Sequence, residues 1–129
     1  MKTLLEHTVE VRWADMDALN HINNTLYFRY MEEARIHWLQ RIGYAFSAAT
    51  TGPVIVSTAC EFKRPVVFPA KMTVRLSANP PGRSSLKTYY HFESDDAEVA
   101  VGEAVIVWVD YQRGQSIAIP SLIRDALSS

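Results

Sequence analysis

Residues 24–43 read NTLYFRYMEEARIHWLQRIG and form the longest stretch of the chain with a helical repeat of apolar side chains. Apolar side chains recur in it at the spacing of a single helix face: Tyr27, Met31, Ala34, Trp38 and Ile42. Asn23 or Asn24 is suited to cap the start of a helix, and Gly43 stands where a C-terminal cap belongs. The pattern predicts one long helix of about five turns, from Asn24 to about Gly43.

The predicted helix is unusually apolar. Five further residues widen its apolar stripe: Leu26, Phe28, Tyr30, Ile36 and Leu39. We expect a helix of this kind to be covered on most of its sides. On its polar face, Glu33 and His37 stand one turn apart and are expected to pair on the helix surface.

The rest of the chain is typical of β-strands. Residues 8–13 alternate between polar and apolar side chains, which predicts a half-buried strand, and residues 14–23 form a polar loop. Four more strands are predicted at 54–64, 71–78, 83–93 and 98–110. The last is apolar on both faces at 105–109 and is expected inside the sheet. Pro120 is expected to start a short helix at the C-terminus.

This order predicts an α+β fold with an antiparallel sheet of about five strands wrapped around one long helix. The 129 residues fit a single domain, 1–129. The outer face and the edges of such a sheet still need cover, so we expect a homodimer, with a tetramer as the open alternative.

Composition narrows the class of partner. Lys and Arg number 13 against 14 Asp and Glu, for a net charge of −1, which argues against nucleic acid. The apolar runs fall short of the ~20 residues of a membrane span, and we expect no signal peptide. The single cysteine, Cys60, favours a reducing compartment such as the cytoplasm and is interpreted as apolar filler. The 4 histidines lack metal-ligand spacing, so no metal is expected.

The segment before the helix carries a resemblance. Residues 13–27, WADMDALNHINNTLY, resemble the start of the hotdog-fold acyl-CoA thioesterases of the 4-hydroxybenzoyl-CoA thioesterase type. Residues 59–69, ACEFKRPVVFP, are similar to the second-strand region of that family, and residues 83–86, RSSL, to the basic start of the next strand. The order of elements matches over nearly the whole chain.

The resemblance implies roles for three residues. It places the chemistry on Asp17, as nucleophile or as general base, and the carbonyl-polarising backbone N–H on Asn24. His21 matches a histidine of the related acyl-carrier-protein thioesterases. Leu19 stands where that branch carries an asparagine, so its polar triad is not reproduced. The expected substrate is an acyl-CoA, with an acyl-carrier protein as the open alternative, and no cofactor besides the coenzyme A of the substrate.

Other residues are expected to hold the substrate. Candidates for the coenzyme A end are Arg83, which follows a tight turn, with Ser84, Lys63, Arg64 and Lys71. The acyl pocket is expected to be shaped by Tyr27, Trp38, Phe46 and the loop 45–51.

Each assignment has an alternative. The alternative for Asp17 is a structural role, as a loop carboxylate that caps a turn or pairs with Arg12. Asp15 is expected to accept hydrogen bonds from loop amides. The first alternative function is that of a hotdog hydratase or dehydratase. That branch of the fold is marked by a pattern resembling Asp-x-Asn-Pro-x-His, which is absent here. A non-catalytic acyl-CoA-binding module is the second alternative.

Overall fold

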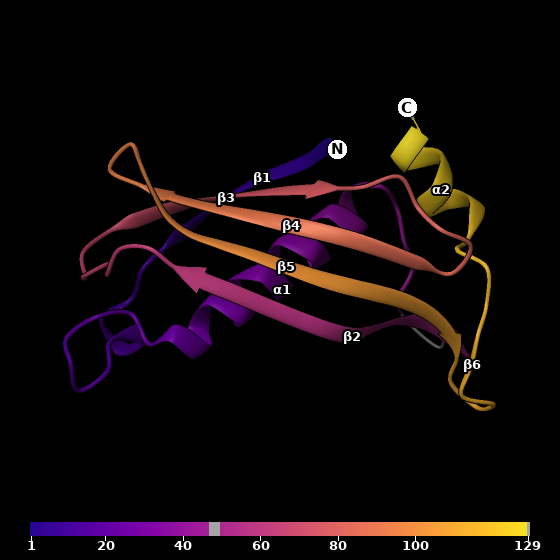
Figure 1. The fold of residues 1–129 in the computed structure, drawn as a ribbon, viewed down its shortest axis with the longest axis horizontal. Coiled ribbons are helices and arrows are strands. Elements are labelled where there is room, and N and C mark those ends of the chain that lie inside the picture. The colour runs from indigo at the N-terminus through magenta and orange to yellow at the C-terminus, as the bar shows by residue number, and fades with distance from the viewer. Residues whose placement is uncertain (47–49, 129) are drawn as a thin grey trace.

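The computed structural model describes residues 1–46 and 50–128, so residues 47–49 of the predicted pocket loop lie outside the described part. The elements in chain order are β1 (Lys2–Glu10), the 3₁₀ turn η1 (Trp13–Asp15), α1 (Asn24–Arg41), β2 (Thr51–Phe62), β3 (Lys71–Ala78), β4 (Ser85–Ser94), β5 (Ala97–Asp110), β6 (Gln115–Ser116) and α2 (Ser121–Ser128). The curved sheet lies over α1, and α2 lies at one end of it (Figure 1).

The sheet has 6 strands in the order β1-β3-β4-β5-β2, with β6 paired to the end of β5. Every pairing is antiparallel. β5 lies between β4 and β2, which confirms the interior position that its two apolar faces predicted. The short β6 was not predicted, because its two residues are too few to show an alternation.

The prediction for the N-terminal strand was wrong at both ends. β1 spans Lys2–Glu10 instead of 8–13. Trp13 is the last apolar residue of the predicted 8–13 alternation, on the same face as Val9 and Val11, but it lies in η1 and is 75% exposed. The cause is local: the Asp15 carboxylate accepts a 3.0 Å hydrogen bond from the backbone N–H of Arg12 and turns the chain out of the sheet. The other four predicted strands are present with small shifts at their ends.

The caps of α1 are those that the sequence predicted. The Asn23 side chain accepts a 3.0 Å hydrogen bond from the backbone N–H of Thr25, which satisfies one of the amides that a helix start leaves open. At the other end Gly43 has φ +86°, a conformation that glycine adopts without a steric penalty. Its N–H donates to the Gln40 carbonyl at 3.1 Å and closes the last turn.

Within one chain, α1 is covered on one side only, so the expectation of cover on most sides was wrong. Its buried residues are Tyr27, Tyr30, Met31, Ala34, Trp38 and Leu39. Ile36 is 37% exposed, because the sheet of a single chain curves over one face of the helix. The helix comes very close to β5 at Gly102, where an added Cβ would stand 2.8 Å from the Met31 sulfur. Within the described part, neither α1 nor α2 has the length and apolar character needed to cross a membrane.

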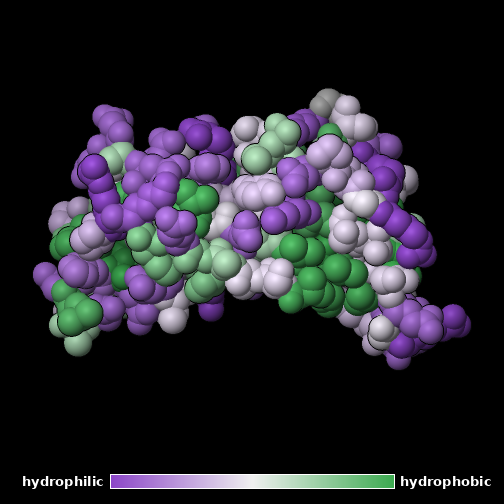
Figure 2. All heavy atoms as spheres, in the orientation of Figure 1, coloured by the Kyte–Doolittle hydropathy of each residue, from purple (hydrophilic) through white to green (hydrophobic). Residues whose placement is uncertain are grey.

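β2 is a long edge strand, and among the described residues it pairs only with β5. Its middle residues, 55–59, are all exposed, with Ile55 at 41% and Val56 at 58%. Hydrophobic side chains gather over the β5–β2 margin of the sheet (Figure 2). An exposed apolar edge strand of this length is a template for pairing with another chain.

Candidate active site

The loop between η1 and α1 is a closed, hydrogen-bonded turn. Met16 and Ile22 form an isolated antiparallel bridge. Inside it, the N–H of Asp17 donates to the His21 carbonyl at 2.9 Å, and the N–H of Asn20 donates back to the Asp17 carbonyl at 2.9 Å. Asn20 has φ 63°, a left-handed conformation that asparagine tolerates well. The loop therefore sets Asp17 and His21 opposite each other at its neck.

Asp15 has the structural role that was expected. It is 8% exposed, and one carboxylate oxygen accepts hydrogen bonds from the Arg12 N–H at 3.0 Å and the Tyr30 hydroxyl at 2.9 Å. Its carbonyl accepts from the Asn23 N–H at 3.0 Å. Burial, and then the bond to Asp15, raises the pKa of Tyr30, so the phenol stays protonated and donates. Asp15 thus joins the loop to α1.

Asp17 caps a turn, as one of the two readings expected. Its Oδ1 accepts a 2.9 Å hydrogen bond from the Leu19 N–H. Within the part of the chain that the structure describes, Asp17 has no ion pair with Arg12, whose contact goes to Asp15 instead. The second oxygen, Oδ2, makes no hydrogen bond among these residues. The carboxylate is therefore oriented through one oxygen while the other remains open.

A groove opens at the start of α1. We call it the helix-start groove; it has a volume of about 280 Å³ and is lined by His21, Ile22, Asn24, Tyr27, Phe62, Lys63, Arg64 and Pro65. The structure therefore brings most of the predicted site residues together from the loop, α1 and the end of β2. Asp17 does not line it but is joined to His21 at the neck of the loop.

Aromatic packing fixes the floor of the groove. Tyr27 is 3% exposed and meets Phe62 and Phe92 edge-on, with ring centroids 5.0 and 5.2 Å apart. Burial raises the pKa of Tyr27 to about 12. Burial also raises the pKa of the half-buried Cys60 thiol to about 11, so this thiol stays protonated and suits the role of filler.

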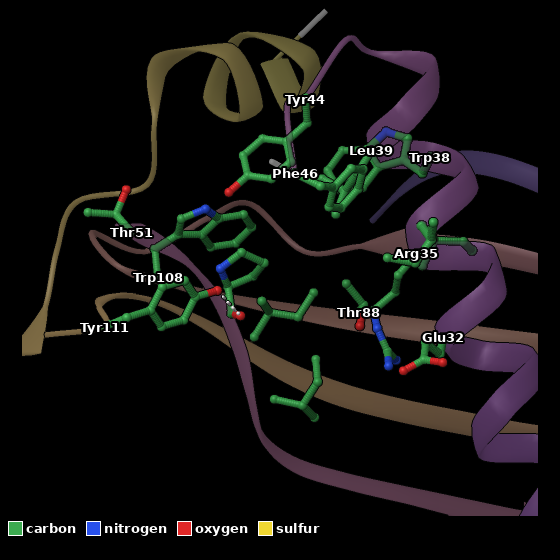
Figure 3. Close-up of a pocket in the computed structure, with 15 residues that line it drawn as sticks. Glu32, Arg35, Trp38, Leu39, Tyr44, Phe46, Thr51, Thr88, Trp108 and Tyr111 are labelled. Atoms are coloured by element: carbon green, nitrogen blue, oxygen red, sulfur yellow. Dashed lines mark hydrogen bonds between the residues drawn. The ribbon is translucent and has the colours of Figure 1, made fainter. Parts of the chain in front are cut away.

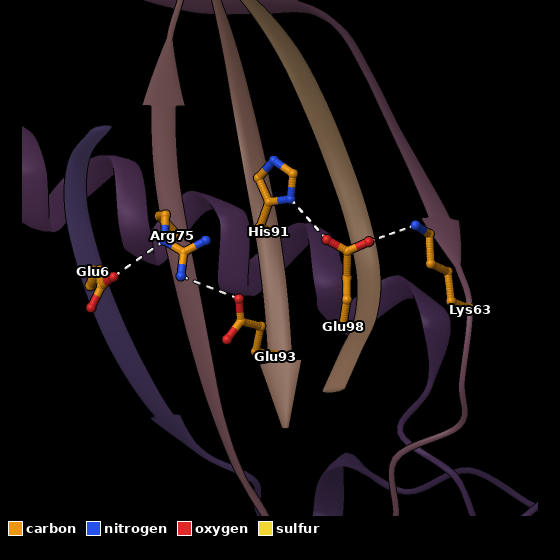
Figure 4. A network of polar contacts seen from close by, with 6 residues as sticks. All are labelled: Glu6, Lys63, Arg75, His91, Glu93 and Glu98. Atoms are coloured by element: carbon orange, nitrogen blue, oxygen red, sulfur yellow. Dashed lines mark hydrogen bonds and ion pairs between the residues drawn. The ribbon is translucent and has the colours of Figure 1, made fainter. Parts of the chain in front are cut away.

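The two basic residues of the groove differ in their partners. The Lys63 ammonium lies 2.6 Å from Glu98 Oε1, and Glu98 also meets His91 Nδ1 at 3.0 Å (Figure 4). The hydrogen bond from Lys63 is the main reason why the pKa of Glu98 lies below 4.5. Arg64 has no ion pair among the described residues, so its charge remains available for a ligand.

Arg83 and Ser84 were expected beside the other substrate-binding residues, and within one chain they are not. Their neighbour Ser85 pairs with Val107, whereas Phe62 pairs with Ala100 on the same strand, β5. At about 3.3 Å per residue the two places are roughly 23 Å apart. The reason is topological, because the turn before β4 lies at the opposite end of β5 from the groove.

A second cavity lies between the C-terminal half of α1 and the sheet (Figure 3). This helix-end cavity has a volume of about 300 Å³ and is lined by Glu32, Arg35, Ile36, Trp38, Leu39, Tyr44, Phe46, Thr51, Pro53, Ile55, Leu76, Thr88, Ile106, Trp108 and Tyr111. Trp38 and Phe46 were expected at an acyl pocket, and both are here, whereas Tyr27 is at the groove. Arg35 and Thr88 were missed, since no motif marks them.

One polar atom in the wall of this cavity lacks a partner. The buried indole N–H of Trp108 meets no acceptor at hydrogen-bonding geometry among the described residues. Its neighbour is the Tyr44 hydroxyl, whose pKa rises because of burial and is partly lowered again by Trp108. Nearby, the Tyr111 hydroxyl donates to the Pro53 carbonyl at 3.1 Å and closes over the end of β2.

The predicted surface pair of Glu33 and His37 was wrong. Glu33 lies 3.8 Å from His7 Nε2 on β1, and the His7 ring stacks on His37 with centroids 4.3 Å apart. Burial, and then His37, lowers the pKa of His7. Packing of β1 against this face of α1 brings His7 between the two helix residues, which helical spacing alone does not reveal.

Three solved structures from other proteins have a fold similar to that of this chain. The PA2801 protein of Pseudomonas aeruginosa, named as a candidate thioesterase, is 36% identical with a TM-score of 0.92, over 98% of this chain and 99% of its own. BH1999, a gentisyl-coenzyme A thioesterase, is 26% identical with a TM-score of 0.85, over 97% and 100%. XC229 of Xanthomonas campestris, named as a candidate acyl-CoA thioesterase, is 33% identical with a TM-score of 0.80, over 92% and 100%.

The family assignment rests on the sequence as well as on the fold. The sequence model of the thioesterase-like superfamily matches residues 11–127, which includes the loop, α1 and all of the sheet except β1. The resemblance to hotdog-fold thioesterases is thereby confirmed, and the antiparallel sheet over one central helix is consistent with that fold. The chain belongs to the thioesterase-like superfamily.

Proposed function

We propose that this protein is an acyl-CoA thioesterase, which hydrolyses its substrate to a free acid and coenzyme A at the helix-start groove. One observation carries the proposal: the first turn of α1 opens into a groove whose wall includes His21, and His21 is bonded to the loop of Asp17. The family and the names of its related structures favour thioester hydrolysis over other chemistry.

The start of α1 supplies a donor for the thioester oxygen. The N–H of Thr25 is bonded to the Asn23 side chain, and the N–H of Leu26 is bonded to the Asn23 carbonyl at 2.9 Å. Among the described residues, the N–H of Asn24 has no acceptor, and Asn24 lines the groove. A carbonyl bound there is polarised by this amide and by the helix dipole. One such donor contributes about 3–4 kcal/mol to the transition state.

Asp17 completes the chemistry by one of two routes. As a nucleophile, its free oxygen attacks the thioester carbon, the C–S bond breaks, the coenzyme A thiolate leaves, and water then hydrolyses the mixed anhydride. As a general base, it takes a proton from a water molecule whose oxygen attacks the same carbon; the C–S bond then breaks and the coenzyme A thiolate leaves, and the proton passes on to it or to solvent. In both routes His21, which lines the groove and whose carbonyl is bonded to the Asp17 N–H, is proposed to orient the water or the carboxylate.

Pairing of β2 with β2 of a second copy is the second part of the proposal. The exposed stretch 55–59, with the hydrophobic side chains of Ile55 and Val56, is what supports it. Thr51, Pro53 and Ile55 line the cavity on the α1 side of the strand. A bulge between Ile55 and Ser57 shifts the alternation, so the even-numbered residues beyond it face α1. A two-fold axis between Val56 and Ser57 then keeps the α1-facing residues of both copies on the same side.

This pairing brings the helix-end cavity and the helix-start groove of different copies together. It sets Thr51 beside Phe62 of the partner subunit and Pro53 beside Cys60 of the partner subunit. The helix-end cavity of one copy then adjoins the helix-start groove of the other. It also brings Arg83 of the partner subunit within three strand spacings of the groove, roughly 14 Å. Arg64 and Arg83 are thus the cations proposed for the coenzyme A phosphates.

The test is release of free thiol from a panel of acyl-CoAs by the purified full-length chain, followed with a thiol-reactive dye. We expect turnover of at least one thioester. Loss of enoyl-CoA absorbance without thiol release would make the protein a hydratase. Binding of acyl-CoA without either reaction would make it a binding module, and each of these results would overturn the proposal.

A further inference from the structure

Arg35 projects from α1 into the helix-end cavity, toward Thr88 and the floor of the sheet (Figure 3). One of its guanidinium N–H groups donates to the Tyr90 hydroxyl at 3.2 Å, and its Cζ lies 5.7 Å from the centre of the Tyr90 ring. Among the described residues, no carboxylate lies within ion-pair distance of Arg35. A partly buried cation in an apolar cavity is therefore left without a counter-ion.

The one acidic residue in the cavity wall is engaged elsewhere. Glu32 lies 3.6 Å from the Arg29 guanidinium, one turn earlier on the outer side of α1. Its side chain is 57% exposed, so solvent screens the charge that it presents to the cavity.

The hydroxyl groups beneath Arg35 form a chain with a fixed direction. The Thr88 hydroxyl donates to the Ala104 carbonyl at 3.0 Å, which uses its single hydrogen. The Tyr90 hydroxyl, 2.7 Å from the Thr88 oxygen, must therefore be the donor to Thr88. Tyr90 in turn accepts from Arg35. All these hydrogens point into the sheet, so the donors left for a ligand are the remaining N–H groups of Arg35.

The rest of the wall is apolar and largely aromatic. Trp38, Leu39, Phe46 and Trp108 surround a volume of about 300 Å³, at the small end of ligand pockets. Such a space excludes a nucleotide and suits a short or ring-sized carbon body. A ligand that fills it is expected to be apolar along its length, with an acceptor oxygen that meets the guanidinium.

From this geometry we infer that the helix-end cavity binds the acyl part of the substrate and that Arg35 selects acyl groups with an acceptor oxygen remote from the thioester. That the ligand is an acyl group rests on the proposed function. The cavity and the Arg35 donor in it do not depend on that function. A carboxylate and a hydroxyl share the required chemistry. An acyl group without such an oxygen leaves the guanidinium unpaired and is disfavoured.

The first test compares thioesters of equal chain length: hexanoyl-CoA, ω-hydroxyhexanoyl-CoA and adipoyl-CoA, with longer homologues of each. For the wild type, kcat/KM is expected to favour one of the oxygen-bearing members by roughly tenfold or more over its parent. The carboxylate and hydroxyl arms show which oxygen is preferred. Arg35→Met, which keeps roughly the length of the side chain and removes the charge, is expected to abolish the preference by lowering kcat/KM for the oxygen-bearing members more than for the parent.

The matched control is Arg41→Met, which removes the same charge from an exposed position at the end of the same helix. It should keep the preference. Equal preference in wild type and Arg35→Met, or equal loss of every substrate, would overturn the proposal. Dissociation of the Arg35→Met dimer in sedimentation would make Arg35 an interface residue and overturn it too.

A binding measurement separates this inference from the proposed function. Trp38 and Trp108 line the cavity, so occupancy should change tryptophan fluorescence. The probes are hydrolysis-resistant 2-oxoalkyl-CoA thioethers with and without a terminal oxygen. Tighter binding of the oxygen-bearing probe that depends on Arg35 supports the inference even if no thioester is hydrolysed. Equal binding of both probes contradicts it even if hydrolysis occurs.

Discussion

The Tyr30 hydroxyl donates a 2.9 Å hydrogen bond to the Asp15 carboxylate, so the loop that carries Asp17 is tied to the helix that it precedes. Both partners are buried, at 2% and 8% exposure. The position of the proposed catalytic carboxylate relative to the α1 amide therefore depends on a buried contact outside the groove.

Tyr30→Phe is expected to lower the free energy of unfolding by about 1–3 kcal/mol, because it leaves a buried carboxylate short of one donor. Denaturant unfolding measures this change. Tyr89→Phe is the control, since it also removes a hydroxyl with a hydrogen bond, 3.1 Å from Asn79 Nδ2, but on a partly exposed face. An equal loss in both variants would contradict the special role of the Asp15 bond.

Glu98→Gln is expected to lower the melting temperature at neutral pH by an amount that disappears in acid. The pKa of Glu98 lies below 4.5 in the folded chain, first because of Lys63 and then because of His91. A lowered carboxyl pKa stabilises the fold fully above the unfolded value, and the stabilisation is lost as pH falls through the folded value. Melting temperatures of both proteins should therefore approach each other as the pH falls below 4.5 and coincide once it lies below the lowered pKa of Glu98. A difference that persists at the lowest pH would show that packing is responsible.

Gly102→Ala is expected to destabilise the fold by about 1–3 kcal/mol, because the new methyl group must displace Met31. The added Cβ would lie 2.8 Å from the Met31 sulfur. Met31→Ala also destabilises alone, but the double variant should be more stable than the sum of the two losses predicts. Strict additivity in thermal or denaturant unfolding would show that the two residues are not in contact.

Val56→Lys is expected to shift the protein from dimer to monomer in sedimentation and to reduce thiol release. It places a charge at the centre of the exposed edge of β2, where charges block pairing. Leu122→Lys is the control, since Leu122 is 43% exposed on α2, away from this edge. A Val56→Lys variant that stays a dimer would contradict the proposed pairing.

Local signals in the sequence account for the parts of the fold that were predicted. The start and end of α1 were predictable because Asn23 and Gly43 act through their own backbone neighbours. The bounds of β3, Lys71–Ala78, follow from strict alternation. The prediction for Trp13 was wrong because the hydrogen bond between Asp15 and the Arg12 N–H turns the chain and ends the strand alternation before Trp13.

The candidate site was predictable only where it is continuous in sequence. His21 and Asn24 belong to one sequence motif. Lys63 and Arg64, which follow β2, line the same groove. The order of the strands in the sheet places Arg83 far from the helix-start groove of the same chain, and no residue spacing in the sequence predicts this separation. Arg35, on α1, was not predicted, because its role depends on the hydroxyl groups of Thr88 and Tyr90, which lie on β4.

Asp17 is proposed to carry out the chemistry at the start of α1. Asp17→Asn tests it cleanly, since the amide keeps the oxygen that accepts from the Leu19 N–H and loses only the charge. Asp96→Asn is the matched control, an exposed turn residue with φ 60° that asparagine tolerates equally well.

The deciding measurement is kcat/KM for thiol release by the wild type, Asp17→Asn and Asp96→Asn on the acyl-CoA that the wild type hydrolyses best. We expect a loss of roughly a thousandfold for Asp17→Asn, with an unchanged melting temperature, and no loss for Asp96→Asn. Wild-type activity in a folded Asp17→Asn protein would contradict it.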